Sequence, residues 1–346
     1  MKRPSGLFNI NYNQELAFVR TPFQWGMLGL VILLAYALPL FVSASWWDFF
    51  IKIWITTIAV LGLSLLTGFC GQISLGHAAF MAVGGFVGAI VLNSGVPLVL
   101  ALIIAGIAAG VVGLVFGLPA LRIKGLYLAF STLAGYYIIK FILVHYAGGD
   151  VGHRVVAPDI LGFSFDSDFR IYHLALTICV IMAYFAKNIT RCKWGRAFIA
   201  IRDHEIAANT LGVNIYFYKL VAFFMGCFYA GIAGLVLVVY MGWASVDYFS
   251  MFDCIWYLGM IVVGGMGSIG GTFMGVLFIL GINQIGAVGA PELAKTFPQV
   301  AGTIIGALPI FLVGLTIVLF IMYEPRGLMH RWNILKNSVR IFPFAN

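Results

Sequence analysis

Ten long apolar runs, separated by short segments that carry most of the charge, dominate this sequence. Most runs are near the roughly twenty residues that a helix needs to cross the hydrocarbon core of a bilayer, and a few are shorter. The runs occupy residues 27–45, 50–70, 74–93, 97–118, 125–146, 171–187, 218–240, 252–264, 272–288 and 300–322. Because 62% of the residues are apolar and 9% are charged, the chain has too few charges to cover a soluble protein of its length. The sequence therefore predicts an all-α polytopic membrane protein with about ten transmembrane helices, some of them broken or short.

The distribution of lysine and arginine predicts that both termini are cytoplasmic. With a cytoplasmic N-terminus, the segments on the inner side are 1–26, 119–125, 187–219 and 322–346. They hold fifteen lysine and arginine residues, whereas the outer segments hold four and one falls within a run. Basic residues are enriched in this way on the cytoplasmic side of membrane proteins. The same distribution argues against a nucleic-acid partner, because the net charge of +8 follows the ends of the apolar runs.

The expected organisation is a cytoplasmic N-terminal segment (1–26), a transmembrane domain (27–322) and a cytoplasmic tail (323–346). The weakest predicted span is 252–264, because Asp253 lies at its start and a run of glycines follows it. Both termini lie on the same side only if this segment crosses the membrane. Residues 42–44 are compatible with signal-peptidase cleavage, but the long leader and the spans that follow disfavour it.

The sequence shows no motif of a catalytic or metal site. A Gly-x-x-x-x-Gly-Lys-Ser/Thr phosphate loop, an HExxH motif and a GxSxG motif are all absent. The five cysteines lack CxxC or metal-ligand spacing, and four of them lie in apolar runs, which is typical of buried small hydrophobic residues. We therefore expect no enzyme activity, and no cofactor or metal bound by this chain. As a membrane protein, the chain would be surrounded by the lipid bilayer.

One segment, residues 194–219, concentrates charge between two apolar runs. Within it the sequence predicts a short helix over residues 204–211. Asp203 is the expected N-cap of this helix and Gly212 its stop.

Arg202 and Glu205 are three residues apart and are expected to pair on one helical face. A short, capped, charged helix at the membrane edge suits docking of a partner protein. Its charges alone are equally compatible with a solvated connector.

A second segment, residues 71–80, interrupts an apolar region with glycines and polar side chains. Gln72, Ser74 and His77 at membrane depth cost free energy unless they line a cavity or find partners. Glycines allow backbone polar groups to face such a cavity, as in the broken helices of transporters. His77 alone is also compatible with a histidine packed between helices. The glycine run at 264–271 likewise has two alternative interpretations, a break that faces a substrate and a tight turn that packs helices together.

The acidic residues give no sign of an ion-coupled carrier. Those near the spans all lie at predicted span ends, namely Asp48, Asp253, Glu292 and Glu324. The outer loop at 147–170 carries a further group, Asp150, Asp159, Asp166 and Asp168. This loop is compatible with contact to a soluble partner or substrate, and with an ordinary solvated loop.

Five motifs follow one another along the chain: GQISLGHAAF, GLYLAFSTLA followed by GGDVG, GRAFIAIRDHEIAANTLGVNIYFYKL, GGMGSIGG and EPRGL. This series resembles the LivM-type permeases of ATP-driven branched-chain amino acid importers, a group that also includes urea and amide permeases. The resemblance covers residues 61–328, and the segment at 195–220 is its most specific part. The sequence departs from the family at Ala147, Asn209 and Thr272, where a threonine, an acidic residue and a proline are usual.

The resemblance implies two groups of site residues. The candidates for the translocation path are Gln72, Ser74, Gly76, His77, Gly265, Gly267 and Ser268. In the family a cytoplasmic loop, here residues 188–217, docks on the ATPase. The matching residues are Gly195, Arg196, Arg202, Asp203, Glu205, Ala208, Leu211 and Gly212.

The resemblance also implies a function. The chain is expected to be a permease subunit of the bacterial inner membrane and to form half of the translocation path for branched-chain amino acids or a related small polar solute. A second, similar permease would complete the path, two ATPase subunits would use the ATP, and a periplasmic binding protein would deliver substrate. The alternative is a self-sufficient channel or carrier for a small polar solute such as urea.

Overall fold

The computed structural model describes most of the chain. The described residues are 22–43, 46–120, 125–148, 152–156, 158–160, 163–165, 167–296, 299 and 301–341. Residues 1–21 of the expected N-terminal segment lie outside them, as do Asp150 and Asp166 of the acidic outer loop.

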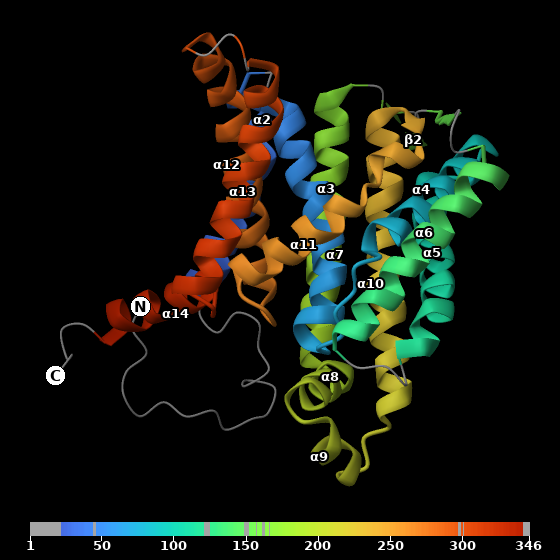
Figure 1. The fold of residues 1–346 in the computed structure, drawn as a ribbon, viewed down its shortest axis with the longest axis vertical. Coiled ribbons are helices and arrows are strands. Elements are labelled where there is room, and N and C mark those ends of the chain that lie inside the picture. Colours follow the sequence, from blue (N-terminus) through green and yellow to red (C-terminus); the bar gives the residue numbers. More distant parts are fainter. Residues whose placement is uncertain are drawn as a thin grey trace.

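Apolar helices account for all ten predicted spans (Figure 1). They are α2 (Pro22–Phe41), α3 (Trp47–Leu63) with its π-helical continuation η2 (Ser64–Phe69), α4 (His77–Asn93), α5 (Leu98–Ala120), α6 (Leu126–Tyr146), α7 (Asp168–Arg191), α10 (Ile215–Met241), α11 (Met251–Gly264), α12 (Ile269–Thr296) and α13 (Ala301–Tyr323). Among the described residues, eight helical spans are long and apolar enough to cross a membrane, and Trp25–Phe41 and His77–Asn93 are shorter. The predicted all-α polytopic membrane protein, with some broken or short helices, is therefore confirmed.

Many of the segments that connect these helices lie at two opposite ends of the bundle, whereas the segment between η2 and α4 runs inside it (Figure 1). One end carries α8 (Lys193–Asp203) and α9 (Glu205–Thr210), and α14 (Leu328–Ile341) follows α13 on that side. The other end carries the strands β1 (His153–Arg154), β2 (Asp159–Ile160), β3 (Phe163–Ser164) and β4 (Trp243–Ala244), and the 3₁₀ turn η3 (Val246–Tyr248). Strand β1 pairs antiparallel with β4, and β2 pairs with β3. In the predicted orientation, which stays a prediction, the α8–α9 end is the cytoplasmic one.

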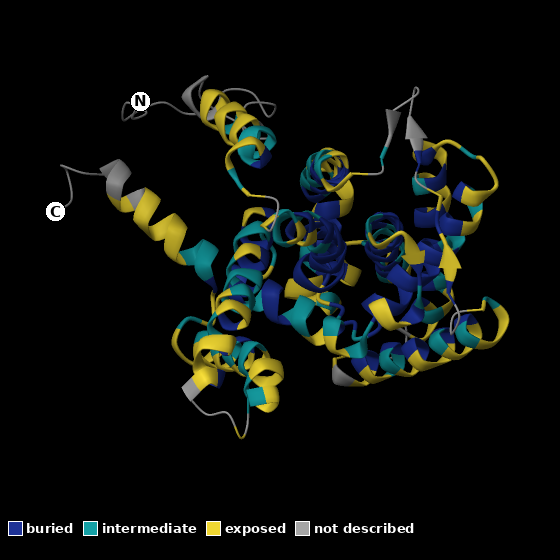
Figure 2. Cartoon of the chain, turned by 90° about the horizontal axis from the view of Figure 1, so that it is seen from above, coloured by how far each residue is buried: buried dark blue, intermediate teal, exposed yellow. Residues whose placement is uncertain are grey.

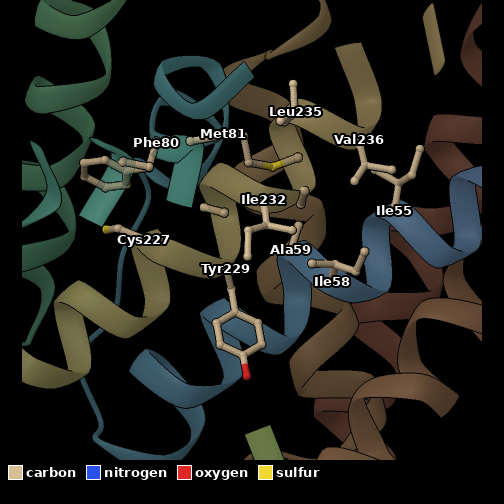
Figure 3. Close-up of a cluster of buried hydrophobic side chains, with 14 of the residues drawn as sticks. Ile55, Ile58, Ala59, Phe80, Met81, Cys227, Tyr229, Ile232, Leu235 and Val236 are labelled. Carbon is tan, nitrogen blue, oxygen red and sulfur yellow. The ribbon is translucent and has the colours of Figure 1, made fainter. Parts of the chain in front are cut away.

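Helix α10 lies at the centre of the larger core, against α3, α4 and α5. Ile58, Phe80 and Leu235, one from each of α3, α4 and α10, are among its side chains (Figure 3). Glycines set the spacing, since a Cβ at Gly84 of α4 would overlap the backbone of Gly231 of α10. Small residues allow membrane helices to approach this closely. The van der Waals contacts that result take the place of the hydrophobic driving force, which is absent between helices in lipid.

A smaller core joins α3 to the α11, α12 and α13 helices. Val60, Met260, Val276 and Val313, one from each of these helices, are buried in it. The outer helices bury much less of their surface, and Figure 2 shows the buried residues gathered on the central helices with exposed residues around them. Apolar side chains such as Val318 are exposed on α13, as expected for a surface in contact with lipid.

The weakest predicted span does form a helix. Helix α11 begins with a capping box, in which the Ser250 hydroxyl accepts from the amide of Phe252 and the Asp253 carboxylate accepts from the amide of Ser250. These bonds satisfy amides that have no partner inside the helix. Asp253 is therefore a cap at the start of a span, which explains its position beside an apolar run.

Candidate functional site

The α3 helix changes into the π-helix η2 before the chain leaves helical geometry. The loop that follows, residues 71–76, folds back on the end of η2. The amide of Gln72 donates to the Leu66 carbonyl at 3.2 Å, and the Thr67 hydroxyl donates to the Gln72 carbonyl at 2.9 Å. π-Helical turns are rare and are frequent at functional sites. The structure thus contains a broken helix where the polar segment interrupts the apolar sequence.

Gln72 is buried in this loop with its side-chain amide unpaired. The residue is 4% exposed, and its amide oxygen and nitrogen both lack a hydrogen-bond partner among the described residues. It lines a cavity of about 350 Å³ at the α8–α9 end, here called the small cavity. The lining includes Cys70, Gly71, Gln72, Arg202, Glu205 and Lys219. Because an unpaired buried amide is costly, this group is suited to bind water or a polar solute.

The other candidates in this segment pack inside the protein. The Ser74 hydroxyl is 3.4 Å from the amide of Gly76, and a Cβ at Gly76 would overlap the Thr132 carbonyl of α6. His77 is fully buried, with its Nε2 2.9 Å from a backbone carbonyl of α3 and its Nδ1 unpaired among the described residues. These contacts favour the packed interpretation of His77, whereas Gln72 faces a cavity.

The glycine run forms the turn between α11 and α12 and lies directly against η2. A Cβ at Gly68 of η2 would lie 2.9 Å from the backbone nitrogen of Gly267. On the other side of the turn, a Cβ at Gly327 in the EPRGL motif would lie 2.5 Å from the Cα of Gly265. Three segments that are far apart in the sequence, namely the end of η2, the glycine run and the EPRGL motif, therefore meet through backbone contacts that leave no room for side chains.

A larger cavity of about 570 Å³ opens where these motifs meet, and it is here called the large cavity. The residues that line it include Gly68, Gly71, Arg202, Gly265, Ser268 and Arg326. Two candidates from the glycine run, Gly265 and Ser268, thus face a cavity, while Gly267 contacts Gly68. Gly71 and Arg202 also line the small cavity, so the two cavities share part of their walls.

The charged segment forms two helices, and the expected cap is wrong. Asp203 is the last residue of α8, and His204 is the N-cap of α9, its Nδ1 accepting from the amide of Ala207 at 3.3 Å. The carboxylate of Asp203 instead contacts the Arg202 guanidinium at 2.8 and 2.9 Å. The predicted stop is confirmed, because Gly212 follows α9 with a φ of +81°.

The expected pair between Arg202 and Glu205 is also wrong. The backbone is extended at His204, so the two side chains do not share a helical face. Glu205 pairs with Lys219 at 2.7 Å and thereby ties α9 to α10. Lys219 is 6% exposed and Glu205 is 24% exposed, so this ion pair is largely sheltered from water.

The remaining candidates of the charged segment divide into exposed and buried residues. Arg196, Asp203, Leu211 and Gly212 are exposed at the end of the bundle. Gly195 is buried where α8 meets the end of α7, and Ala208 is buried beneath α9. Arg202 is also exposed, with 34% of its side chain accessible, and its guanidinium donates to the Gly68 carbonyl at 3.0 Å.

Sequence reasoning missed three residues of this region. Ile206 is 69% exposed and Leu211 is 82% exposed, although both are apolar. Lys219 carried a usable signal, because a lone lysine at the start of an apolar run needs a partner. Gly68 carried none, since it lies inside an unbroken apolar run. Among the residues that the structure describes, no group of three or more His, Cys, Asp or Glu side chains is placed to hold a metal ion.

Comparison with known proteins shows the family of the chain. Residues 46–314 match the model of a family described as the permease component of branched-chain amino acid transport systems. The high-affinity branched-chain amino acid transport permease LivM of Escherichia coli is 28% identical over 327 residues, covering 86% of this chain and 73% of that protein. Its counterpart in Salmonella typhimurium is 27% identical over the same lengths. A probable LivM of Methanocaldococcus jannaschii is 28% identical over 187 residues, or 52% of this chain and 53% of that protein. No solved structure matches.

Proposed function

Because the chain belongs to the family of permease components of branched-chain amino acid transport systems, we propose that it forms half of a translocation path through a bacterial inner membrane. As a permease component it is a non-catalytic membrane subunit that works with an ATPase and a binding protein. A second, similar permease would supply the other half of the path. Two ATPase subunits would hydrolyse ATP at the α8–α9 end. A periplasmic binding protein would deliver a branched-chain amino acid or a related small polar solute.

The observation that supports the translocation role is the side-chain amide of Gln72, which has no partner among the described residues and lies beside the small cavity. A zwitterionic amino acid carries an ammonium group, which donates hydrogen bonds, and a carboxylate, which accepts them. The oxygen of a glutamine amide accepts and its nitrogen donates, so Gln72 is able to bind either group. The glycines that line the two cavities add backbone groups without side chains that would narrow them.

We assign ATPase docking to the exposed face of α8 and α9 and the turn after it, here called the docking surface. It consists of Arg196, Asp203, Ile206 and Leu211. Two exposed apolar side chains at an end of the bundle that carries charged residues are unfavourable in water. Protein interfaces commonly have this composition, with apolar anchors and charged residues around them. The sheltered pair between Glu205 and Lys219 would hold this surface in place.

The translocation role is tested by ATP-dependent uptake in vesicles that contain the whole transporter. Gln72→Leu should lower uptake at least about tenfold, since a hydrogen bond to a charged group contributes about 1.5–3 kcal/mol. The matched control is Gln284→Leu, which changes a half-buried glutamine on α12 outside both cavities. Both variants should still co-purify with the ATPase.

Two results would contradict the proposal. Uptake by Gln72→Leu at the rate of the unchanged protein would remove Gln72 from the path. Uptake by the purified chain alone, without ATPase and ATP, would instead indicate a self-sufficient channel.

A further inference from the structure

Arg202 lies where α8, which carries part of the docking surface, meets the broken helix. It is the penultimate residue of α8, yet its Nη1 donates to the Gly68 carbonyl of η2 at 3.0 Å. The other side of the guanidinium is fixed by Asp203, whose carboxylate oxygen is 2.9 Å from Nε and 2.8 Å from Nη2. The planar group is therefore held by a carboxylate of its own helix and by a carbonyl of another.

The carbonyl that accepts this bond belongs to the end of a helix. The last carbonyls of a helix lack partners within it, and they need a side chain, water or another backbone group. Gly68 is the second-last residue of η2, and the chain leaves helical geometry directly afterwards. A bond from a charged donor is about twice as strong as one between neutral groups, and the Arg202 guanidinium supplies such a donor to the Gly68 carbonyl.

Two glycines make room for the arginine side chain. A Cβ at Gly71, in the loop after η2, would lie 3.1 Å from Cγ of Arg202. A Cβ at Gly267, in the α11–α12 turn, would lie 2.6 Å from its Nη1. The guanidinium thus passes between the end of η2 and the α11–α12 turn, here called the two breaks, and contacts both. It also lines both cavities.

We propose that Arg202 is a positioning residue that transmits movement of α8 to the two breaks, and that gripping the ATPase is not its role. This inference rests on the proposed function, in which ATP binding moves the docking surface. When α8 moves, the guanidinium carries the end of η2 and the α11–α12 turn with it, and the shared wall of the two cavities changes. An arginine suits this task because its planar fork donates in two fixed directions at once, which a lysine ammonium does not.

The test follows the accessibility of the native Cys70, which is buried and lines the small cavity. The background is Cys192→Ser, which removes the exposed cysteine. The complete transporter is treated with a thiol-reactive maleimide, with and without a non-hydrolysable ATP analogue. In the unchanged protein the nucleotide should alter the labelling rate of Cys70, because movement of α8 reaches η2 through Arg202.

The first variant is Arg202→Gln, with Lys193→Gln as the matched control at an exposed basic position of the same helix. Arg202→Gln should keep the ATPase bound, lower uptake at least about tenfold, and abolish the effect of nucleotide on Cys70 labelling. The expected size of the loss in uptake follows from the loss of a hydrogen bond from a charged donor, which shifts an equilibrium about tenfold or more. Arg202→Lys, which keeps the charge without the fork, should restore only part of the coupling.

The second variant leaves the docking surface unchanged. Gly267→Ala places a methyl group against Nη1 of Arg202 and should produce the same loss of nucleotide-dependent labelling. Its φ of +76° also strains any side chain, so the control is Gly95→Ala, at a φ of +83° with no atom within 4 Å of the added Cβ. This variant decides the matter if Arg202→Gln fails to insert.

Each outcome is informative. Loss of ATPase binding by Arg202→Gln would make Arg202 a docking residue and overturn the proposal. A nucleotide-dependent labelling rate of Cys70 that persists in both variants would overturn it too. So would a labelling rate of Cys70 that is the same with and without nucleotide in the unchanged protein. Failure of the unchanged chain to bind any ATPase would instead refute the proposed function.

Discussion

The sheltered ion pair between Glu205 and Lys219 gives a prediction whose size follows from the structure. At 2.7 Å and an effective dielectric constant of about 20, the Coulomb attraction is about 6 kcal/mol before desolvation. Desolvation of Lys219 and the partial exposure of Glu205 cancel much of this, which leaves a net effect nearer that of a charged hydrogen bond, about 2 kcal/mol. Glu205→Gln leaves the ammonium of Lys219 buried without its counter-charge. We expect it to release α9 from α10 and weaken ATPase binding about thirtyfold.

The assay combines ATPase affinity with thermal unfolding of the purified permease. Glu205→Gln, Lys219→Met and the double variant form a cycle that isolates the pair. The double variant should bind the ATPase better than Glu205→Gln, because it removes the unpaired charge. The swap of Glu205→Lys with Lys219→Glu should recover part of the affinity. A simple charge reversal at Glu205 does not test docking alone, because it sets two ammonium groups against each other beneath the docking surface.

A coupling energy below about 0.5 kcal/mol in this cycle would refute the reasoning, since it would place the pair among exposed salt bridges of little energetic value. So would an ATPase affinity of Glu205→Gln equal to that of the unchanged protein. Loss of ATPase binding in the double variant as large as in Glu205→Gln would instead show that the ATPase contacts the Glu205 carboxylate directly.

Three further predictions follow from the fold. A reporter fused after Asn346 should be cytoplasmic and one inserted at Asp159 periplasmic; the opposite result for either would reject the orientation from the positive-inside rule. Leu211→Asp should insert normally but lose ATPase co-purification, because it places a charge at an apolar anchor; retained co-purification would exclude this part of the docking surface. Gly234→Ala should lower the yield of folded protein severalfold, because its Cβ would overlap the α4 backbone. The control Gly281→Ala, with nothing within 4 Å of the added Cβ, should leave the yield unchanged. Equal yields of the two variants would contradict close α4–α10 packing.

The spans were predictable because the bilayer imposes a length and an apolar composition on every helix that crosses it. The run at 252–264 shows how local chemistry refines such a prediction. The sequence places Asp253 beside an apolar run, and the structure explains it as the second half of a capping box with Ser250. Backbone amides at a helix start attract such side chains, and the charge therefore marks the boundary of the span.

The pairing of the charged segment was not predictable from spacing. Residues three apart face each other only on a continuous helix, and the extended backbone at His204 removes that condition. Glu205 then reaches Lys219, fourteen positions along the chain, because α9 folds back against α10. A prediction from spacing assumes that the helix continues, whereas tertiary contacts decided here which charge was close.

The convergence of the motifs was equally hidden, because contacts between glycines have no side-chain pattern. Gly68 lies in an apolar run and Gly267 in a turn, yet a Cβ at the first would lie 2.9 Å from the backbone of the second. The structure adds that Arg202 and Gly71 belong to the walls of both cavities. One side of those walls is the helix that leads into the docking surface, and the other is the break that holds the unpaired amide of Gln72. Under the proposed function, a movement of α8 would change the surroundings of Gln72 directly, and coupling between the two regions would need no long chain of intermediate contacts.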